Sequence, residues 1–168
     1  MSRVKKILAL CALMTLPIAL AGCSGGKAKN SSEIVVGIPQ DLEDSLDPHK
    51  AVAAGTKEIL FNVYEGLLKP DSQGNNIPAV AESYKVSDDL TTYTFTLRQG
   101  VKFHNGKLVT AEDVKYSIDK FAGLAADEEP LNSAFSVIKE VNIVDDKTVD
   151  VVLNQPDGDL PTYLAMVS

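Results

Sequence analysis

A cysteine behind an apolar leader is the residue of this sequence whose surroundings point most directly to chemistry. Cys23 follows Leu20, Ala21 and Gly22, and small residues at these positions give a peptidase access to the backbone before the cysteine. The thiol of such a cysteine is a nucleophile that accepts a diacylglyceryl group. The pattern therefore predicts lipidation at Cys23, with an ordinary signal peptide and a chance cysteine as the alternative.

The remaining cysteine and the two histidines do not form a recognisable metal or redox site. His49 and His104 lie far apart in the sequence and show no metal-ligand spacing to each other or to a cysteine. Cys11 would leave with the leader and Cys23 would carry lipid, so the mature protein would hold no disulfide and no catalytic thiol. We therefore expect no metal and no cofactor.

Pairs of adjacent acidic residues are better explained as solvated turns than as catalytic groups. Hydrolysis needs carboxylates separated across a cleft, and adjacency in the sequence does not provide that separation. No nucleophile with a base and an acid is visible either. We therefore expect no catalytic residue and no enzymatic activity. The pairs are Glu43/Asp44, Asp88/Asp89, Glu128/Glu129 and Asp145/Asp146.

The charge of the chain argues against a nucleic acid partner. The formal net charge is −7 over 168 residues, and the three basic residues near the start are not matched by any acid within residues 1–22. An acidic body repels phosphate backbones, and no basic stripe offsets that repulsion. At 45% hydrophobic residues, the chain can build a packed core.

The start of the chain is predicted to lie outside the fold. Residues 1–22 join a basic beginning to an apolar stretch, residues 7–20, which is short for a membrane span and typical of a signal peptide. Residues 23–33 are small and polar, so we expect a flexible tether there. Residues 34–168 would form the folded part, outside the cytoplasm and anchored to the membrane by lipid.

The folded part alternates between strand and helix patterns. Polar and apolar residues alternate in residues 92–98, which predicts an antiparallel strand with one buried face, and Val101 and Phe103 are expected to join the core. Strands and helices in this order predict an α/β or α+β fold with mixed strands. Further elements expected are strands at 34–38 and 67–69, a turn at 70–76, a hairpin of 139–145 and 148–154, and helices at 56–64 and 160–168.

A helix beginning after Thr110 is the element with the clearest boundaries. Thr110 and Asp113 resemble a capping box, in which a hydroxyl N-cap is followed three residues later by an acid. Gly123 is a reasonable stop for this helix. Three apolar residues at helical spacing predict one buried stripe: Val114, Ile118 and Phe121.

The stretch from Leu97 to Gly106, followed by Thr110 to Ile118, resembles the signature of family 5 extracellular solute-binding proteins, the receptors of peptide, nickel and related ABC importers. The resemblance implies a periplasmic-binding-protein type 2-like fold, of which this chain would be the N-terminal part of lobe I with its extra subdomain, the second lobe being absent. The segments 45–48, 63–68, 78–84 and 151–156 agree with the family in the same order.

The resemblance also implies a ligand site. In peptide-binding relatives the loop after the first strand lines the cleft, where its backbone can pair with an extended ligand. A plain connection between strand and helix is the alternative. The corresponding residues here are Leu42, Glu43, Asp44, Ser45, Leu46 and Asp47.

The function that the resemblance implies is capture of peptides outside the membrane by the substrate-binding component of an ABC importer. Its partners would be a peptide ligand, the permease subunits and, through the lipid, the membrane. A receptor for another solute such as nickel and a truncated surface lipoprotein with an interaction role are the alternatives.

Overall fold

The computed structural model describes residues 35–38, 45–51, 53–124, 130–131 and 133–166. The chain divides into two compact units, Met1–Gly37 and Ile38–Ser168, and every helix and strand named below belongs to the second unit. The predicted signal peptide (residues 1–22), the predicted lipidation site Cys23 and the predicted tether (residues 23–33) all lie outside the described residues.

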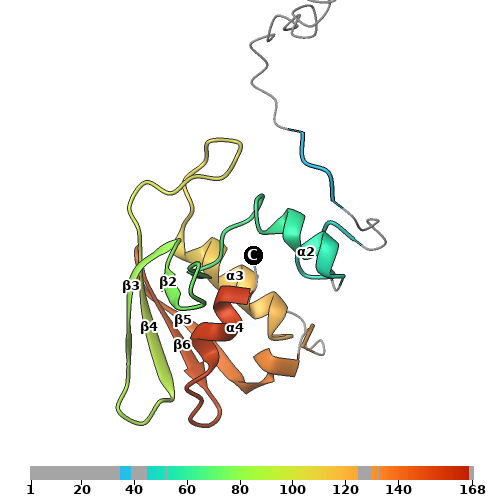
Figure 1. Cartoon of the computed structure of the whole chain (residues 1–168). Coiled ribbons are helices and arrows are strands. Elements are labelled where there is room, and N and C mark those ends of the chain that lie inside the picture. Colours follow the sequence, from blue (N-terminus) through green and yellow to red (C-terminus); the bar gives the residue numbers. More distant parts are fainter. Residues whose placement is uncertain (1–34, 39–44, 52, 125–129, 132, 167–168) are drawn as a thin grey trace, which may run out of the picture. The chain divides into compact units, whose positions relative to one another are not determined.

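A four-stranded antiparallel sheet forms the centre of the second unit, with the strand order β3-β4-β6-β5 (Figure 1). The predicted strand at 92–98 and the hairpin of 139–145 and 148–154 are confirmed as β4 and as the pair β5 and β6. Both described sheets are antiparallel throughout, where the sequence predicted mixed strands. The strands of this sheet are β3 (Ala81–Val86), β4 (Thr92–Leu97), β5 (Ile138–Asp145) and β6 (Thr148–Leu153).

One face of this sheet carries the core. In β4, Tyr93 and Phe95 are buried while the threonines that alternate with them along the strand are partly exposed, as strict alternation predicts. In β6, Val149 and Val151 lie on the same face, directly opposite Phe95 and Tyr93. These pairs bring large and branched apolar side chains together across adjacent strands, which is how a sheet gains most of its stability.

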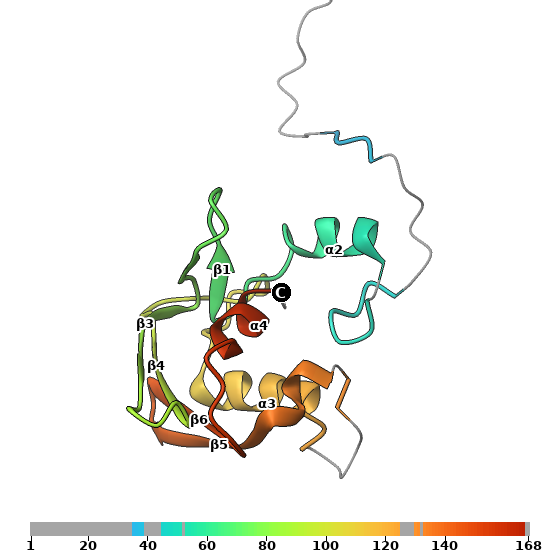
Figure 2. The ribbon, with the colours of Figure 1, turned by 60° about the horizontal axis from the view of Figure 1, so that its bottom comes forward.

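Two helices and a small hairpin cover that face (Figure 2). Helix α3 (Ala111–Phe121) packs on β5 and β6, where the Nζ of Lys115 donates a 2.7 Å hydrogen bond to the carbonyl of Val141. Helix α4 (Leu160–Met166) packs against the hairpin. The hairpin strands are β1 (Leu68–Pro70) and β2 (Asn76–Pro78), joined at the predicted 70–76 turn.

Helix α3 begins and ends as the sequence predicts. The Oγ1 of Thr110 accepts the N–H of Asp113 at 3.2 Å, and the Oδ2 of Asp113 accepts the N–H of Thr110 at 2.9 Å, which is a complete capping box. Gly123 follows the helix with φ of 72°, a backbone angle that glycine adopts without strain. The predicted stripe is buried: Val114, Ile118 and Phe121.

The Thr110→Ala variant tests this cap. Removing the hydroxyl leaves the N–H of Asp113 without its acceptor, so we expect a loss of about 1 kcal/mol of unfolding free energy. Urea denaturation followed by far-ultraviolet circular dichroism measures the loss. The matched control is Glu112→Gln, which changes the same helical turn without touching the box, and an equal effect of both variants contradicts the capping role.

Two predicted elements differ in the structure. Residues 35–38 form no strand, because β-branched residues favour an extended backbone but a strand also needs a neighbour for its N–H and C=O groups. The predicted helix at 56–64 is α2 (Ala54–Leu60), after which the chain continues to Tyr64 in tighter turns. The N–H of Val63 bonds to the carbonyl of Leu60, three residues back, and this tightening turns Val63 toward solvent.

Phe103 is a further correction, because it is 45% exposed and does not belong to the core. Lys102 pairs with Leu108 in an isolated bridge, so residues 101–109 fold back on themselves rather than extending β4. Val101 does pack against the core, as predicted. Gly100, just before this segment, and Gly106 within it have φ of 82° and 84°, a backbone conformation that glycine adopts without strain.

Candidate functional site

The predicted ligand loop ends in a compact turn. Leu42, Glu43 and Asp44 lie outside the described residues, whereas Ser45, Leu46 and Asp47 are described, and Leu46 is 54% exposed. The described part of this candidate site is therefore the second half of the loop with the residues that follow it.

Asp47 uses its backbone groups within the turn. Its N–H donates to the Oγ of Ser45 at 3.0 Å, and its carbonyl accepts the N–H groups of Lys50 at 2.9 Å and Ala51 at 3.0 Å. A ligand strand that paired with Asp47 would have to break these bonds. Among the described residues of the loop, Asp47 is therefore poorly suited to backbone pairing with an extended peptide.

The side chain of Asp47 also bonds within the turn. Its Oδ1 accepts the N–H of His49 at 3.0 Å and lies 3.2 Å from the Nδ1 of the same histidine. The backbone hydrogen bond from His49 is the main cause that holds the pKa of Asp47 below its usual value, and the bond from the imidazole adds to it. Asp47 is thus favoured in its charged form, and its carboxylate is held against His49 by hydrogen bonds.

His49 attaches the turn to helix α3. Its ring centroid lies 4.3 Å from that of Phe121, and Phe121 in turn stacks on Phe135 at 5.3 Å. The His49 side chain is 13% exposed, and its Nε2 is buried without a hydrogen-bond partner among the described residues. We call these three rings, His49, Phe121 and Phe135, the ring stack.

Two adjoining pockets lie beside the ring stack, with volumes of about 510 Å³ and about 420 Å³. The ring stack lines the smaller pocket together with Pro48, whereas Ser45, Leu46 and Asp47 are not among the lining residues. The predicted ligand loop therefore runs directly into a pocket wall at residues 48 and 49. The two pockets share these lining residues: Tyr64, Glu65, Gly66, Val80, Phe103 and Val109.

Exposed aromatic side chains line these pockets, and sequence reasoning missed them. Phe61, Tyr64 and Phe103 are between 43% and 49% exposed, and Tyr116 of α3 is 63% exposed. A concentration of large apolar side chains around hollows marks a binding surface more often than a solvated one. Tyr116 lies off the buried stripe of its helix, and that position is the signal that could have identified it.

The acidic groups beside the pockets already have partners. Glu65 accepts a hydrogen bond from the Nζ of Lys69 at 2.8 Å, and Asp113 belongs to the capping box. The arrangement can therefore bind apolar groups, but it does not present a free acid–base pair for catalysis among the described residues.

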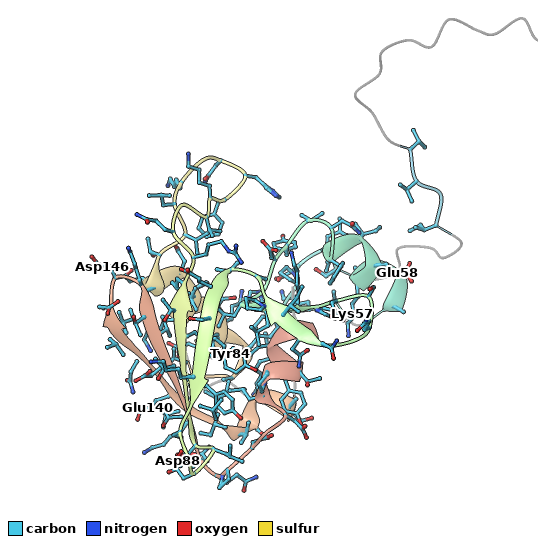
Figure 3. The ribbon with its side chains drawn as sticks, turned by 60° about the vertical axis from the view of Figure 1, so that its left-hand side comes forward. Lys57, Glu58, Tyr84, Asp88, Glu140 and Asp146 are labelled. Carbon is cyan, nitrogen blue, oxygen red and sulfur yellow. The ribbon has the colours of Figure 1, made fainter. Side chains whose placement is uncertain are left out.

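The other candidate residues of the sequence analysis are spread apart. Asp88 and Asp146 mark turns at opposite ends of the sheet, and both are exposed, as are their neighbours Asp89 and Asp145 (Figure 3). These two pairs are the solvated turns that the sequence predicts. The other two pairs, Glu43/Asp44 and Glu128/Glu129, lie outside the described residues. Within the described ranges no three His, Cys, Asp or Glu side chains gather to hold a metal, and no helix is long and apolar enough to span a membrane.

Comparison with known proteins defines the class. Residues 75–168 match the family model for bacterial extracellular solute-binding proteins, family 5 Middle. The structural neighbours are type 2 periplasmic binding proteins, in agreement with the predicted fold class. The chain belongs to the family 5 extracellular solute-binding proteins, as its sequence signature predicts.

Two individual relatives match most or all of this chain. The dipeptide-binding protein DppE of Bacillus subtilis is 32% identical over 193 aligned residues, which cover 100% of this chain and 35% of DppE. The oligopeptide-binding protein AppA of Bacillus subtilis, solved in complex with a nonapeptide, superposes with a TM-score of 0.64 at 28% identity. That match covers 70% of this chain and 23% of AppA.

A third relative was solved with a metal complex. NikZ from Campylobacter jejuni, in complex with Ni(L-His), superposes with a TM-score of 0.57 at 30% identity, covering 62% of this chain and 21% of NikZ. This chain therefore spans about a third or less of the length of the relatives it matches.

Proposed function

We propose that this chain is part of the substrate-binding component of an ABC importer, which captures peptides outside the cytoplasm and delivers them to permease subunits. The observation that carries the proposal is the match to DppE, a dipeptide-binding protein, over 100% of the chain. The nonapeptide complex of AppA supports the same ligand class.

We call the two pockets and the exposed aromatic side chains that line them, Phe61, Tyr64, Phe103 and Tyr116, the pocketed surface. This surface supports a binding site that further polypeptide completes. Tyr64, Phe103 and Tyr116 expose apolar area that a stable protein normally covers, and DppE is about three times as long as the part it shares with this chain. In a receptor of that length, a peptide held at the candidate ligand loop, residues 42–47, by backbone pairing would be enclosed from the other side. Backbone pairing leaves side-chain identity largely unread, which suits a receptor for varied peptides.

A chimera tests the proposal. Residues 1–168 replace the aligned part of DppE, and calorimetry measures binding of a mixed set of di- to pentapeptides. We expect saturable binding in the micromolar range or tighter, about −8 kcal/mol or more favourable. Cooperative thermal unfolding first establishes that the chimera folds. A folded chimera that binds none of the peptides contradicts the proposal.

Nickel complexes are the second ligand class to test, because NikZ holds Ni(L-His). The same chimera is titrated with nickel and L-histidine. Saturable binding of this complex in place of peptides would assign the chain to the nickel alternative.

We further propose that a lipid on Cys23 anchors the mature protein to the membrane. A diacylglyceryl group supplies two acyl chains, which suffice for stable attachment where one chain is marginal. The Cys23→Ser variant is expected to move from the membrane fraction to the soluble fraction when cells are fractionated. Cys11→Ser is the matched control, since Cys11 lies within the predicted signal peptide. Equal partitioning of Cys23→Ser and wild type disproves the anchor.

A further inference from the structure

We infer that His49 is a positioning residue: it fixes residues 45–47, the described end of the candidate ligand loop, to helix α3 by joining Asp47 to the ring stack. The inference rests on the proposed function for the role of the loop, but the attachment itself is independent of any ligand.

The two sides of His49 have different tasks. Its backbone N–H and its Nδ1 both face the Oδ1 of Asp47, at 3.0 Å and 3.2 Å. Its ring lies on Phe121 of α3, which is 8% exposed and itself stacked on Phe135. Asp47 is the last residue of the loop, so movement of the His49 ring on Phe121 would move the end of the loop with it.

A histidine at this position leaves one buried ring nitrogen without a partner, and the contact of the other ring nitrogen with Asp47 offsets this disadvantage. A carboxylate can only accept, so the hydrogen bond between Asp47 and His49 requires a proton on Nδ1. Nε2, the other ring nitrogen, is buried and has no hydrogen-bond partner among the described residues. A phenylalanine could pack on Phe121 without leaving a buried polar atom unpaired. What histidine adds is the Nδ1–H bond to Asp47, and this bond ties the loop to the stack.

Two substitutions separate the two tasks. His49→Phe keeps a ring on Phe121 and removes the donor to Asp47. His49→Asn offers an amide N–H near the Nδ1 position and removes the ring. The readout in the full 168-residue chain is hydrogen exchange of the Lys50 and Ala51 amides, which donate to the carbonyl of Asp47.

We expect both variants to speed exchange of these two amides by about tenfold. In each variant the turn can open locally without breaking the full connection from Asp47 through His49 to Phe121. Exchange of amides in β4 and β6, and the thermal midpoint of His49→Phe, should stay as in wild type. Unchanged exchange at Lys50 and Ala51 in both variants overturns the inference. Faster exchange throughout the protein also overturns it, because His49 would then be a general core residue.

The effect of His49 on ligand binding is measured in the chimera with DppE. His49→Phe should raise the dissociation constant for the tightest-binding dipeptide about tenfold, since a mispositioned loop lowers the population of the binding-competent state. An unchanged dissociation constant overturns the positioning role for the ligand. If the wild-type chimera binds no peptide, the proposed function fails, whereas the exchange measurement still decides whether His49 fixes the turn.

Discussion

Replacing Phe121 with alanine is expected to lower the free energy of unfolding by about 3–5 kcal/mol, the range for truncation of a buried aromatic side chain. Phe121 is 8% exposed and lies at the end of α3, where its ring contacts both His49 and Phe135. Truncation removes the middle ring of the ring stack and enlarges the 420 Å³ pocket that Phe121 lines. A domain is normally stable by only about 5–15 kcal/mol, so the variant is expected to be marginally folded.

Urea denaturation followed by far-ultraviolet circular dichroism measures this loss, because the sequence contains no tryptophan for fluorescence. Tyr116→Ala is the matched control: it truncates an aromatic residue of the same helix that is 63% exposed. We expect the control to change stability by no more than about 0.5 kcal/mol. Similar small losses in both variants would mean that the helix does not pack on its Phe121 face.

Local patterns in the sequence predict the buried face of β4 and the start of helix α3. The alternation in residues 92–98 predicts which face of β4 is buried because side chains point to opposite faces with a period of two. Thr110 and Asp113 predict the start of α3 because the capping box is completed within one turn of the chain. The start of α3 is decided within a few residues, whereas β4 also needs its neighbours β3 and β6, and β6 lies far along the chain.

The pocketed surface could not be predicted in the same way. Alternation of Val101 and Phe103 indicates that they share a side of the chain, but it does not say what covers that side. The structure covers Val101 and leaves Phe103 exposed, because the 101–109 segment folds back through the pairing of Lys102 with Leu108. Whether an apolar residue is buried depends on distant segments, which a single sequence does not reveal.

The turn that contains residues 45–47 of the candidate ligand loop could be predicted from the sequence only in part. Ser45, Asp47 and His49 bond to each other two residues apart, and Asp or Ser bonding to a nearby backbone N–H is a known local signal. The tilted contact between the rings of His49 and Phe121 joins residues 72 positions apart in the sequence. No periodicity connects such positions, so the ring stack became visible only in the structure.

Peptide binding by residues 24–168 alone is expected to be millimolar or weaker, about −4 kcal/mol or less favourable. This polypeptide offers the loop and the pocketed surface from one side, so a bound peptide would remain in contact with water on its other side. Two-lobed receptors gain their affinity by closing around the ligand, which buries both of its faces. The chimera with DppE restores that enclosure, and the difference between the two proteins should be about a thousandfold in dissociation constant.

Calorimetry with the same mixed set of di- to pentapeptides, on residues 24–168 and on the chimera, measures this difference. Thermal unfolding of both proteins is the control that each is folded under the conditions used. Weak binding by residues 24–168 together with micromolar binding by the chimera is the expected pair of results, because enclosure rather than the loop alone then supplies the affinity. Saturable micromolar binding by residues 24–168 would place the whole peptide site within this chain, and the pocketed surface beside the ring stack would then be the first place to search for it, by measuring the affinity of Phe103→Ala and Tyr64→Ala variants.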